Sequence, residues 1–445
     1  MGFIRGEGRQ QVSMFPSTLD ELIPANHMCR VIDAFVEGLA MEKLGFQRAE
    51  AAETGRPGYD PRDLLKVYLY GYFQRIRSSR RLEAECRRNV ELMWLVGRLV
   101  PDHKSISEFR RQHGEAITAA GVELVRLAKA AGLIVGEWIG IDGSKFRAAA
   151  SFRAVRERKD LEQYLAEMEA AEKEDGVAID EQAVAAALEK LRRDPEPEAQ
   201  FMRPAASTHK MPGYNVQIAV DAERALIVAQ AVSTEANDSR SLLPMAEAAR
   251  QALDGQDKPL HVVADVGYSS GEQAEVCEQR GITTHVPAKR GVNAAGDGTL
   301  FDRTEFHYDE SSDTYNCPAG ERLTRRQLSR GGQAVVYTGQ AKICGACALK
   351  PRCTVGAQRT LKRTLHEGAL QRMQERATPE TMKLRRSIVE HPFATLKYYI
   401  FGHPRFLLRG LKGAGAEMSL AVMVYNMKRM INIMGAQRLT AILVT

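Results

Sequence analysis

The sequence predicts a multidomain α+β protein, in which a helical N-terminal part precedes a part built on a mixed sheet. Residues up to about Gly132 carry apolar side chains at spacings of three and four, with few β-branched runs, which is typical of amphipathic helices. From Trp138 onward, strand-like runs alternate with helical ones. At 445 residues the chain is long enough for two or three domains.

The helical part, residues 1–132, is predicted to bind DNA. Arg75 to Arg111 holds 10 Lys+Arg and 5 Asp+Glu, a net charge of 10 − 5 = +5. A helix is expected from Pro61, and another after Pro101, with Ser105 as its cap and Glu108 three residues later. A short helix, a turn and a basic helix favour major-groove docking; the alternative is a helical bundle with charged outer faces. The candidate DNA contacts are Arg80, Arg81, Lys104, Arg110 and Arg111.

The second part has a defined expected order of elements. The sequence predicts a strand at 138–142, a helical insertion at 152–200 with Gly176 as a break, strands at 214–221 and 225–232 joined by a hairpin-length link, a helix at 238–253, a strand at 260–265, a helix at 270–280 and a strand at 282–287.

Three acidic residues suit a metal site that acts on phosphodiesters. Asp142 ends the apolar run from Trp138, Asp265 ends another such run, and Glu390 lies within Lys342–Lys412, where 15 Lys+Arg face 4 Asp+Glu, a net charge of 15 − 4 = +11. Three carboxylates can hold two Mg²⁺ (or Mn²⁺) ions, and the basic surroundings suit a polyanion. Rival third carboxylates are Asp221, Asp238 and Asp302. Lys145, Arg386 and Lys397 are candidate phosphate contacts, with plain surface charge as the alternative for Arg386 and Lys397.

Four cysteines predict a structural zinc site within an insertion at 291–355. Cys317, Cys344, Cys347 and Cys353 fall within 353 − 317 + 1 = 37 residues, and Cys-x₂-Cys is a common zinc chelate. His307 could replace one thiol, and free cysteines or a redox pair are the alternatives. The other three, Cys29, Cys86 and Cys277, are expected to be ordinary buried residues.

Five phrases, in this order, carry a family resemblance: Leu19–Pro24, Pro101–Arg110, Gly213–Gln217, Ala264–Tyr268 and Glu390–Phe393. The chain resembles bacterial insertion-sequence transposases with a DDE catalytic core, of the broad IS4/IS5 type and most like the IS1182 family.

The resemblance implies a DNA-end-binding domain at 1–132 and a ribonuclease-H-like catalytic domain at 133–290 and 356–445. In that fold the first Asp lies on the first strand, the second follows the fourth strand, and the Glu comes from a later helix, which assigns Asp142, Asp265 and Glu390. The spacings, 265 − 142 = 123 and 390 − 265 = 125, leave room for both insertions.

The family's Tyr-Arg-Glu-Lys signature is matched in part around Glu390. Arg386 and Lys397 stand at the Arg and Lys positions, but Lys383 stands where the signature has Tyr. Pro392 is expected to kink the helix here, or the helix starts near His391.

The expected activity is binding of the element's ends, two-metal cleavage, and joining of the 3′ ends to target DNA by at least a dimer. The alternatives are an inactive DNA-binding derivative and a metal-dependent nuclease without strand transfer. The start, Met1 to Gln10, is polar, and no run reaches about 18 apolar residues. A bacterial cytoplasmic, nucleoid-associated protein is therefore expected.

Overall fold

The computed structural model describes residues 18–48, 58–172, 180–204, 207–253, 259–288, 300–329 and 331–444. The chain divides into two compact units. Unit 1 comprises Met1–Ile134, Lys145–Tyr214 and Pro392–Thr445, and unit 2 comprises Val135–Ser144 and Asn215–His391. Within these described ranges, no helix has the length and apolarity needed to cross a membrane.

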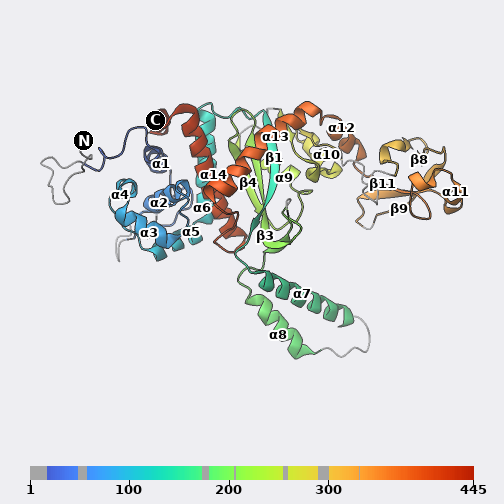
Figure 1. Ribbon diagram of the computed structural model, residues 1–445, viewed down its shortest axis with the longest axis horizontal. Helices are drawn as coiled ribbons and strands as arrows, with labels where there is room; N and C mark the ends of the chain where they lie inside the picture. Colours follow the sequence, from blue (N-terminus) through green and yellow to red (C-terminus); the bar gives the residue numbers. More distant parts are fainter. Residues whose placement is uncertain are drawn as a thin grey trace, which may run out of the picture. The chain divides into compact units, whose positions relative to one another are not determined.

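Unit 1 is mostly helical, as the sequence predicts for the N-terminal part. Its helices outside the insertion are α1 (Met28–Glu37), α2 (Pro61–Phe73), α3 (Ser79–Arg88), α4 (Val90–Leu95), α5 (His103–Gln112), α6 (Gly114–Ala130), α14 (Gly410–Met434) and α15 (Ala436–Val444). Helix α14 packs along α6 and α2 (Figure 1). The C-terminal residues therefore belong with the N-terminal helices, whereas the sequence grouped them with the catalytic region.

Side-chain caps explain where two of these helices start. Asp60 accepts a hydrogen bond from the backbone N–H of Arg62, and Pro61 occupies the first helical position, where its missing N–H costs nothing. Helix α2 thus starts where predicted. Helix α5 does not start at the predicted cap Ser105, because Asp102 accepts from the backbone N–H groups of Lys104 and Ser105 and caps the helix three residues earlier.

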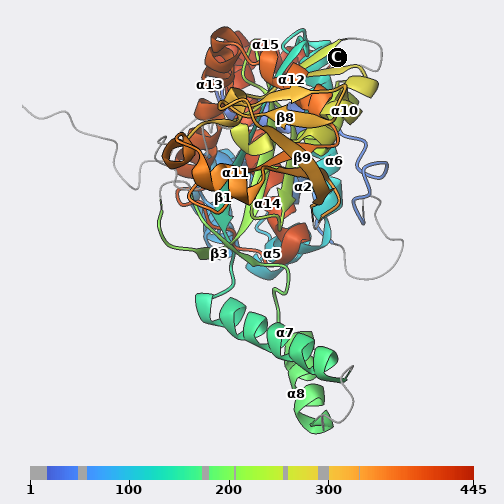
Figure 2. The ribbon, with the colours of Figure 1, turned by 90° about the vertical axis from the view of Figure 1, so that its right-hand side faces the viewer.

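The predicted helical insertion contains two helices, α7 (Phe152–Glu172) and α8 (Glu181–Arg192), which pack against each other as a hairpin (Figure 1, Figure 2). The predicted break at Gly176 lies outside the described residues. Arg158 is buried and donates to the Asp194 carboxylate at 3.2 Å and to the Glu196 carbonyl at 2.9 Å. This arginine ties the first helix to the segment that follows the second.

The sheet of unit 2 has the order β4-β3-β1-β5-β6, and the short β2 (Gln200–Met202) pairs with the first residues of β3. Its strands are β1 (Trp138–Arg147), β3 (Met211–Asp221), β4 (Ile227–Ser233), β5 (Leu260–Val263) and β6 (Ile282–His285). β3 and β4 form an antiparallel hairpin, while β5 pairs in parallel with both β1 and β6. Helices α9 (Leu242–Ala252) and α10 (Gly271–Gln279) alternate with these strands as predicted.

Helix α13 (Pro379–Ala394) lies against β1 at Gly140. A Cβ at Gly140 would come within 2.8 Å of Val389 Cγ1 and 3.0 Å of Ile388 Cγ2, which is too close for a real contact. Glycine therefore lets this helix approach the strand. The expected helix start near His391 is wrong, because α13 begins at Pro379 and includes Pro392. A π-helical stretch, Thr395–Ile400, follows, and such irregularity after proline fits its missing donor.

A second, antiparallel sheet forms the cysteine-rich module, with strand order β11-β10-β9-β8-β7 (Figure 1). Its strands are β7 (His307–Asp309), β8 (Thr314–Asn316), β9 (Arg322–Leu328), β10 (Ala334–Thr338) and β11 (Thr360–Thr364). A small core of Phe306, Tyr315, Leu323, Val335, Tyr337 and Leu361 holds it together. The module extends past the predicted boundary at residue 355, because β10 completes its backbone hydrogen bonds with β11.

Unit 1 contains a buried ionic network centred on Glu417 of α14. Glu417 is 0% exposed, and its carboxylate accepts from Arg77 at 3.2 Å, from Tyr72 at 3.3 Å and from the backbone N–H of Leu407 at 2.7 Å. Arg110, 4% exposed, lies 3.8 Å from the same carboxylate. Glu417 is thus the acidic partner that Arg77 and Arg110 share.

We expect Glu417→Gln to lower the free energy of unfolding by about 3–5 kcal/mol, because it leaves the buried Arg110 and the largely covered Arg77 without their acidic partner. Urea denaturation would measure this. Lys412→Ala is the control: Lys412 and Glu115 form an ion pair whose side chains are 90% and 88% exposed, so its loss should change stability by about 1 kcal/mol or less. Equal effects of the two changes would contradict this account of the network.

Candidate active site

Asp142 and Asp265 lie on neighbouring parallel strands. The register pairs Gly140 of β1 with Val263 of β5, so the two aspartates, each two residues further on, come to the same edge. Asp142 is within β1 rather than at its end, because the strand continues to Arg147. Asp265 follows β5 and caps a short 3₁₀ turn by accepting from the Gly267 N–H at 2.7 Å. The carboxylates of Asp142 and Asp265 therefore lie close together, as the sequence predicts.

Arg385 of α13 bridges the two aspartates. Its Nη2 donates to Asp142 Oδ1 at 2.8 Å and lies 3.7 Å from Asp265 Oδ2. Burial raises the pKa of Asp142 to about 6, although Arg385 acts to lower it, while the neighbouring Asp265 raises it further. The carboxylates of Asp142 and Asp265 repel each other when both are ionised, so this site favours a positive charge beside them.

Arg385 is not among the residues predicted from the sequence, which include its exposed neighbour Arg386 instead. The available signal was helical spacing: Ile388 and Val389, three and four residues after Arg385, are buried against β1, and positions three and four apart share a helix face.

Glu390 lies on the same helix but is exposed. Among the described residues, no hydrogen bond or ion pair joins it to Asp142 or Asp265. Its position five residues after Arg385 places it away from the helix face that carries Arg385, Ile388 and Val389. The structure brings together two of the three predicted catalytic carboxylates.

A polar network lies beside Asp142, around Gly143. Asp238 Oδ1 accepts from Asn215 Nδ2 and from Gln217 Nε2, each at 2.7 Å. Tyr268 donates its hydroxyl proton to Gln217 Oε1. A Cβ at Gly143 would lie 2.4 Å from Gln217 Nε2, 2.7 Å from Asp238 Oδ1 and 3.0 Å from the Tyr268 oxygen. Glycine thus allows the network to sit against the strand.

Of this network only Asp238 was predicted from the sequence, as a rival carboxylate. Asn215 and Gln217 are polar residues two apart in an otherwise apolar strand, so they share one face of it. That pattern could have identified them. The other two rivals lie elsewhere: Asp221 accepts from the Gly136 N–H at 2.9 Å, and Asp302 caps a 3₁₀ turn of the cysteine-rich module.

The two family models that match together span most of the chain. A "Transposase DDE domain" model matches residues 171–427, which include Asp265, Arg385 and Glu390, and a "Transposase domain (DUF772)" model matches residues 17–112. The chain belongs to the DDE transposase family. Among solved structures, the chain is similar to a piggyBac transposase synaptic complex with hairpin DNA studied by cryo-EM, at 7% identity and a TM-score of 0.36, over 94% of this chain and 78% of that one. No curated protein matches.

The predicted DNA-contact cations of the transposase fall into two groups. Arg80, Arg81, Lys104 and Arg111 are exposed on α3 and α5, which pack together. Arg111 forms an ion pair with Glu108. Arg110 is a correction: it is buried and lies near Tyr72 and Glu417, because it occupies the inner face of α5. It is not available to DNA.

The remaining predicted cations lie close in sequence to Asp142 and Glu390. Lys145 is half-buried on β1. Lys397 is half-buried too, and its ammonium lies 5.9 Å and 5.7 Å from the ring centroids of Phe146 and Phe393, within cation–π range. The ammonium group of Lys397 therefore interacts with two aromatic rings of unit 1.

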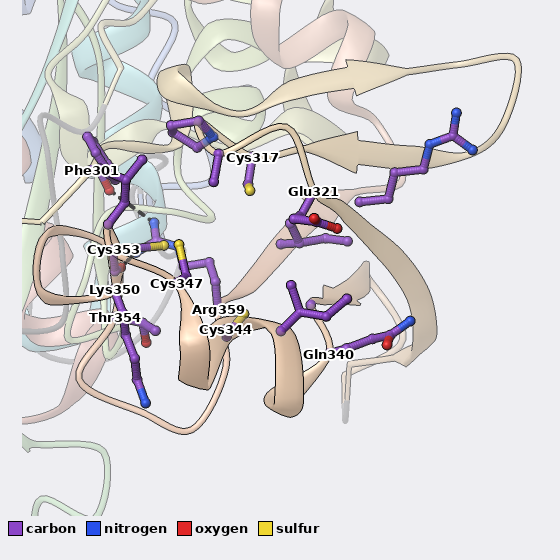
Figure 3. A pocket seen from close by; sticks show the side chains of 17 residues that line it. Phe301, Cys317, Glu321, Gln340, Cys344, Cys347, Lys350, Cys353, Thr354 and Arg359 are labelled. Atoms are coloured by element: carbon purple, nitrogen blue, oxygen red, sulfur yellow. Dashed lines mark hydrogen bonds between the residues drawn. The ribbon is translucent and has the colours of Figure 1, made fainter.

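The four clustered cysteines of the transposase line one pocket of the module (Figure 3). Cys317 follows β8, Cys344 and Cys347 belong to or end α11 (Ala341–Ala346), and Cys353 follows a 3₁₀ turn. All four are free thiols. Burial raises the pKa of the Cys353 thiol, and the other three cysteines raise it further once ionised.

The sulfurs converge without forming a closed tetrahedron. All four cysteines are described by the structure, and no three of their sulfur atoms lie within 4.8 Å of one another. The alternative ligand His307 is exposed, pairs with Asn316 at the outer strand, and does not line the pocket. The other cysteines, Cys29, Cys86 and Cys277, are buried, as predicted.

We expect Gly143→Ala to destabilise the transposase by about 1–3 kcal/mol, because the new methyl group overpacks the network of Gln217, Asp238 and Tyr268. Chemical denaturation would measure the change. Gly415→Ala in α14 is the matched control: no atom lies within 4 Å of the added Cβ, so removing a helical glycine should stabilise by about 1 kcal/mol. A neutral Gly143→Ala change would show that the network is loose.

Proposed function

We propose that this transposase binds the ends of its own element, cleaves phosphodiester bonds there and joins the 3′ ends to target DNA. The observation that supports this most is the pairing of Asp142 with Asp265 at one edge of the sheet. The proposal includes a ribonuclease-H-like catalytic domain, supported by the order β4-β3-β1-β5-β6 with a hairpin followed by alternating helices and strands.

The carboxylates fit a divalent cation with oxygen ligands. Asp142 is held inside a strand and Asp265 directly after one, so both are rigid, and in the structure Arg385 supplies the positive charge that they need. Asp142, Asp265 and Glu390 would hold two Mg²⁺ or Mn²⁺ ions. When bound, such ions activate the attacking water or 3′-hydroxyl and stabilise the leaving oxygen of an in-line displacement.

The protein's own groups position and neutralise charge in this proposal. Arg385 orients Asp142 and Asp265 and reduces their mutual repulsion. Glu390 is the proposed third carboxylate of the ligand set, although it is exposed on a different face of α13 from Arg385 in this structure. In this displacement the oxygen of water or of a DNA 3′-hydroxyl forms the new P–O bond while the opposite P–O bond breaks. Because the nucleophile is not a protein group, no covalent bond to a side chain forms.

Exposed cations of the transposase would hold the DNA. Arg80, Arg81, Lys104 and Arg111 on α3 and α5 present positive charge to solvent, and Arg386, Lys145 and Lys397 are proposed phosphate contacts closer to the catalytic residues in sequence. Phosphate contacts of this kind position DNA without reading its bases. Because two element ends must meet, the active complex contains at least two protein chains.

We expect Asp142→Asn, Asp265→Asn and Glu390→Gln each to abolish cleavage and strand transfer while leaving binding of the element's ends nearly unchanged. Each substitution removes a negative charge from the metal site and keeps the side-chain size. The measurement is strand transfer by purified protein with labelled DNA that carries the element's own ends, in Mg²⁺ or Mn²⁺, with end binding followed by gel shift.

Glu310→Gln, a charge-matched change in the cysteine-rich module, is the control and should transfer strands normally. An active Asp265→Asn variant would overturn the assignment of that residue. Wild-type cleavage without joining would identify a nuclease, and binding with neither reaction would identify a DNA-binding derivative.

The four clustered cysteines are proposed to bind one structural zinc. Support comes from the convergence of Cys317, Cys344, Cys347 and Cys353 on one pocket (Figure 3) and from the small size of the module's core. Zinc–sulfur bonds of about 2.3 Å would draw the thiolates together, and a metal adds stability that such a core lacks. A closed site of four thiolates has no open position for substrate, so this metal would take no part in the chemistry.

We expect about one zinc per chain in the purified transposase, measured by plasma mass spectrometry, and its loss from the Cys344→Ser, Cys347→Ser double variant. The reason is that this variant removes both thiolates of the Cys-x₂-Cys pair. Cys277→Ser, which changes a buried cysteine outside the module, should retain the metal. A zinc-free wild type whose four thiols are all modified by a thiol reagent would refute the site.

A further inference from the structure

A third carboxylate, that of Asp238, lies between the segments that carry Asp142 and Asp265. A Cβ at Gly143, next to Asp142, would lie 2.7 Å from Asp238 Oδ1. A Cβ at Gly267 would lie 3.7 Å from Asp238 Oδ2 and 2.9 Å from Asp265 Oδ1. The carboxylate of Asp238 therefore faces both glycine positions, one beside each catalytic aspartate.

The hydroxyl of Tyr268 lies at the same place. It donates to Gln217 Oε1, and a Cβ at Gly143 would lie 3.0 Å from the Tyr268 oxygen and 2.7 Å from Asp238 Oδ1. The side chains of Tyr268, Gln217 and Asp238 therefore meet beside Gly143.

The orientation of Asp238 is set by two buried amides. Oδ1 accepts from both Asn215 and Gln217 at 2.7 Å, which directs Oδ2 toward Gly267. Asn215 and Gln217 are 0% and 1% exposed, and burying two amides on one strand is costly unless they are hydrogen-bonded. Two hydrogen bonds from buried amides therefore fix the orientation of the Asp238 carboxylate.

An acceptor oxygen beside Asp238 has no partner. The side-chain oxygen of Asn215 is buried and makes no hydrogen bond in the described part of the chain, although the nitrogen of the same amide binds Asp238. Buried polar atoms are almost always paired with protein or solvent. An unpaired oxygen on the amide that holds Asp238 is suited to accept a hydrogen bond from the water shell of a hydrated cation.

We infer that Asp238 is a further metal-binding carboxylate of the catalytic site, oriented by Asn215 and Gln217. This inference rests on the proposed function, because it adds a ligand to the site of Asp142 and Asp265. It assigns the buried amides of β3 a role in positioning, and it assigns Gly143 the role of admitting Asp238 next to the strand that carries Asp142.

The test is the affinity of the DNA-free, full-length protein for Mn²⁺, followed by electron paramagnetic resonance and confirmed by Mg²⁺ competition. Asp238→Asn keeps an Oδ1 acceptor for both amides but removes the charge and replaces Oδ2 with an NH₂ group, so we expect Mn²⁺ to bind at least about tenfold more weakly. Glu235→Gln is the control, because Glu235 is an exposed carboxylate three residues away, paired loosely with Arg240 at 3.8 Å, and should bind Mn²⁺ as the wild type does.

Further variants separate the possible failures. Asp142→Asn should also lose Mn²⁺; if it binds Mn²⁺ normally, the proposed catalytic metal site itself is wrong. If Asp142→Asn loses Mn²⁺ and a folded Asp238→Asn does not, only the inference on Asp238 fails.

If Asp238→Asn lowers the melting temperature, Asp238→Glu separates a metal-binding role from a structural one. Asp238→Glu keeps the charge and is expected to bind Mn²⁺ more tightly than Asp238→Asn. Equal affinities would indicate a purely structural role and overturn the inference.

Discussion

The parallel pairing of β1 with β5 is the constraint on which the rest of the proposed catalytic site depends. This register places Asp142 and Asp265 side by side, and two carboxylates so close repel each other unless a positive charge lies between them. Arg385 meets that need from α13. It can do so only because Gly140 lets the helix approach the strand, where any larger residue would meet Ile388 and Val389. Strand register, glycine and arginine therefore act as one unit.

A second glycine has a comparable effect on the polar side of the site. Gly143 leaves room for Gln217, Asp238 and Tyr268 to approach β1. The amides of β3 are buried in a strand that is otherwise apolar, and they are satisfied largely by one carboxylate, that of Asp238. Buried polar networks rigidify a protein when they are paired and weaken it when they are not. The network thus couples the precise position of Asp238 to the stability of the sheet.

Buried charge serves a different purpose in unit 1. Glu417 is surrounded by Arg77, Tyr72 and backbone N–H groups, with Arg110 close by, so its charge is compensated within the core. Arg80 and Arg81, arginines of the same region, remain exposed and are among the residues proposed to contact DNA. Counting basic residues along the chain could not separate these two classes, because burial of an arginine depends on a carboxylate about 300 residues away in the sequence.

The sequence by itself determined the α+β class, the order of strands and helices in unit 2, the two aspartates, and the cysteine cluster, because each leaves a local pattern: periodicity, an acid after an apolar run, or Cys-x₂-Cys spacing. It also determined the family, which the matching transposase models show. Only the tertiary structure decided that Arg385 rather than Arg386 meets the aspartates, that Arg110 is internal, and that Asn215 and Gln217 hold Asp238 beside Gly143. Those facts depend on strand register and on where glycines permit close approach, and contacts between distant segments leave no local trace in the chain.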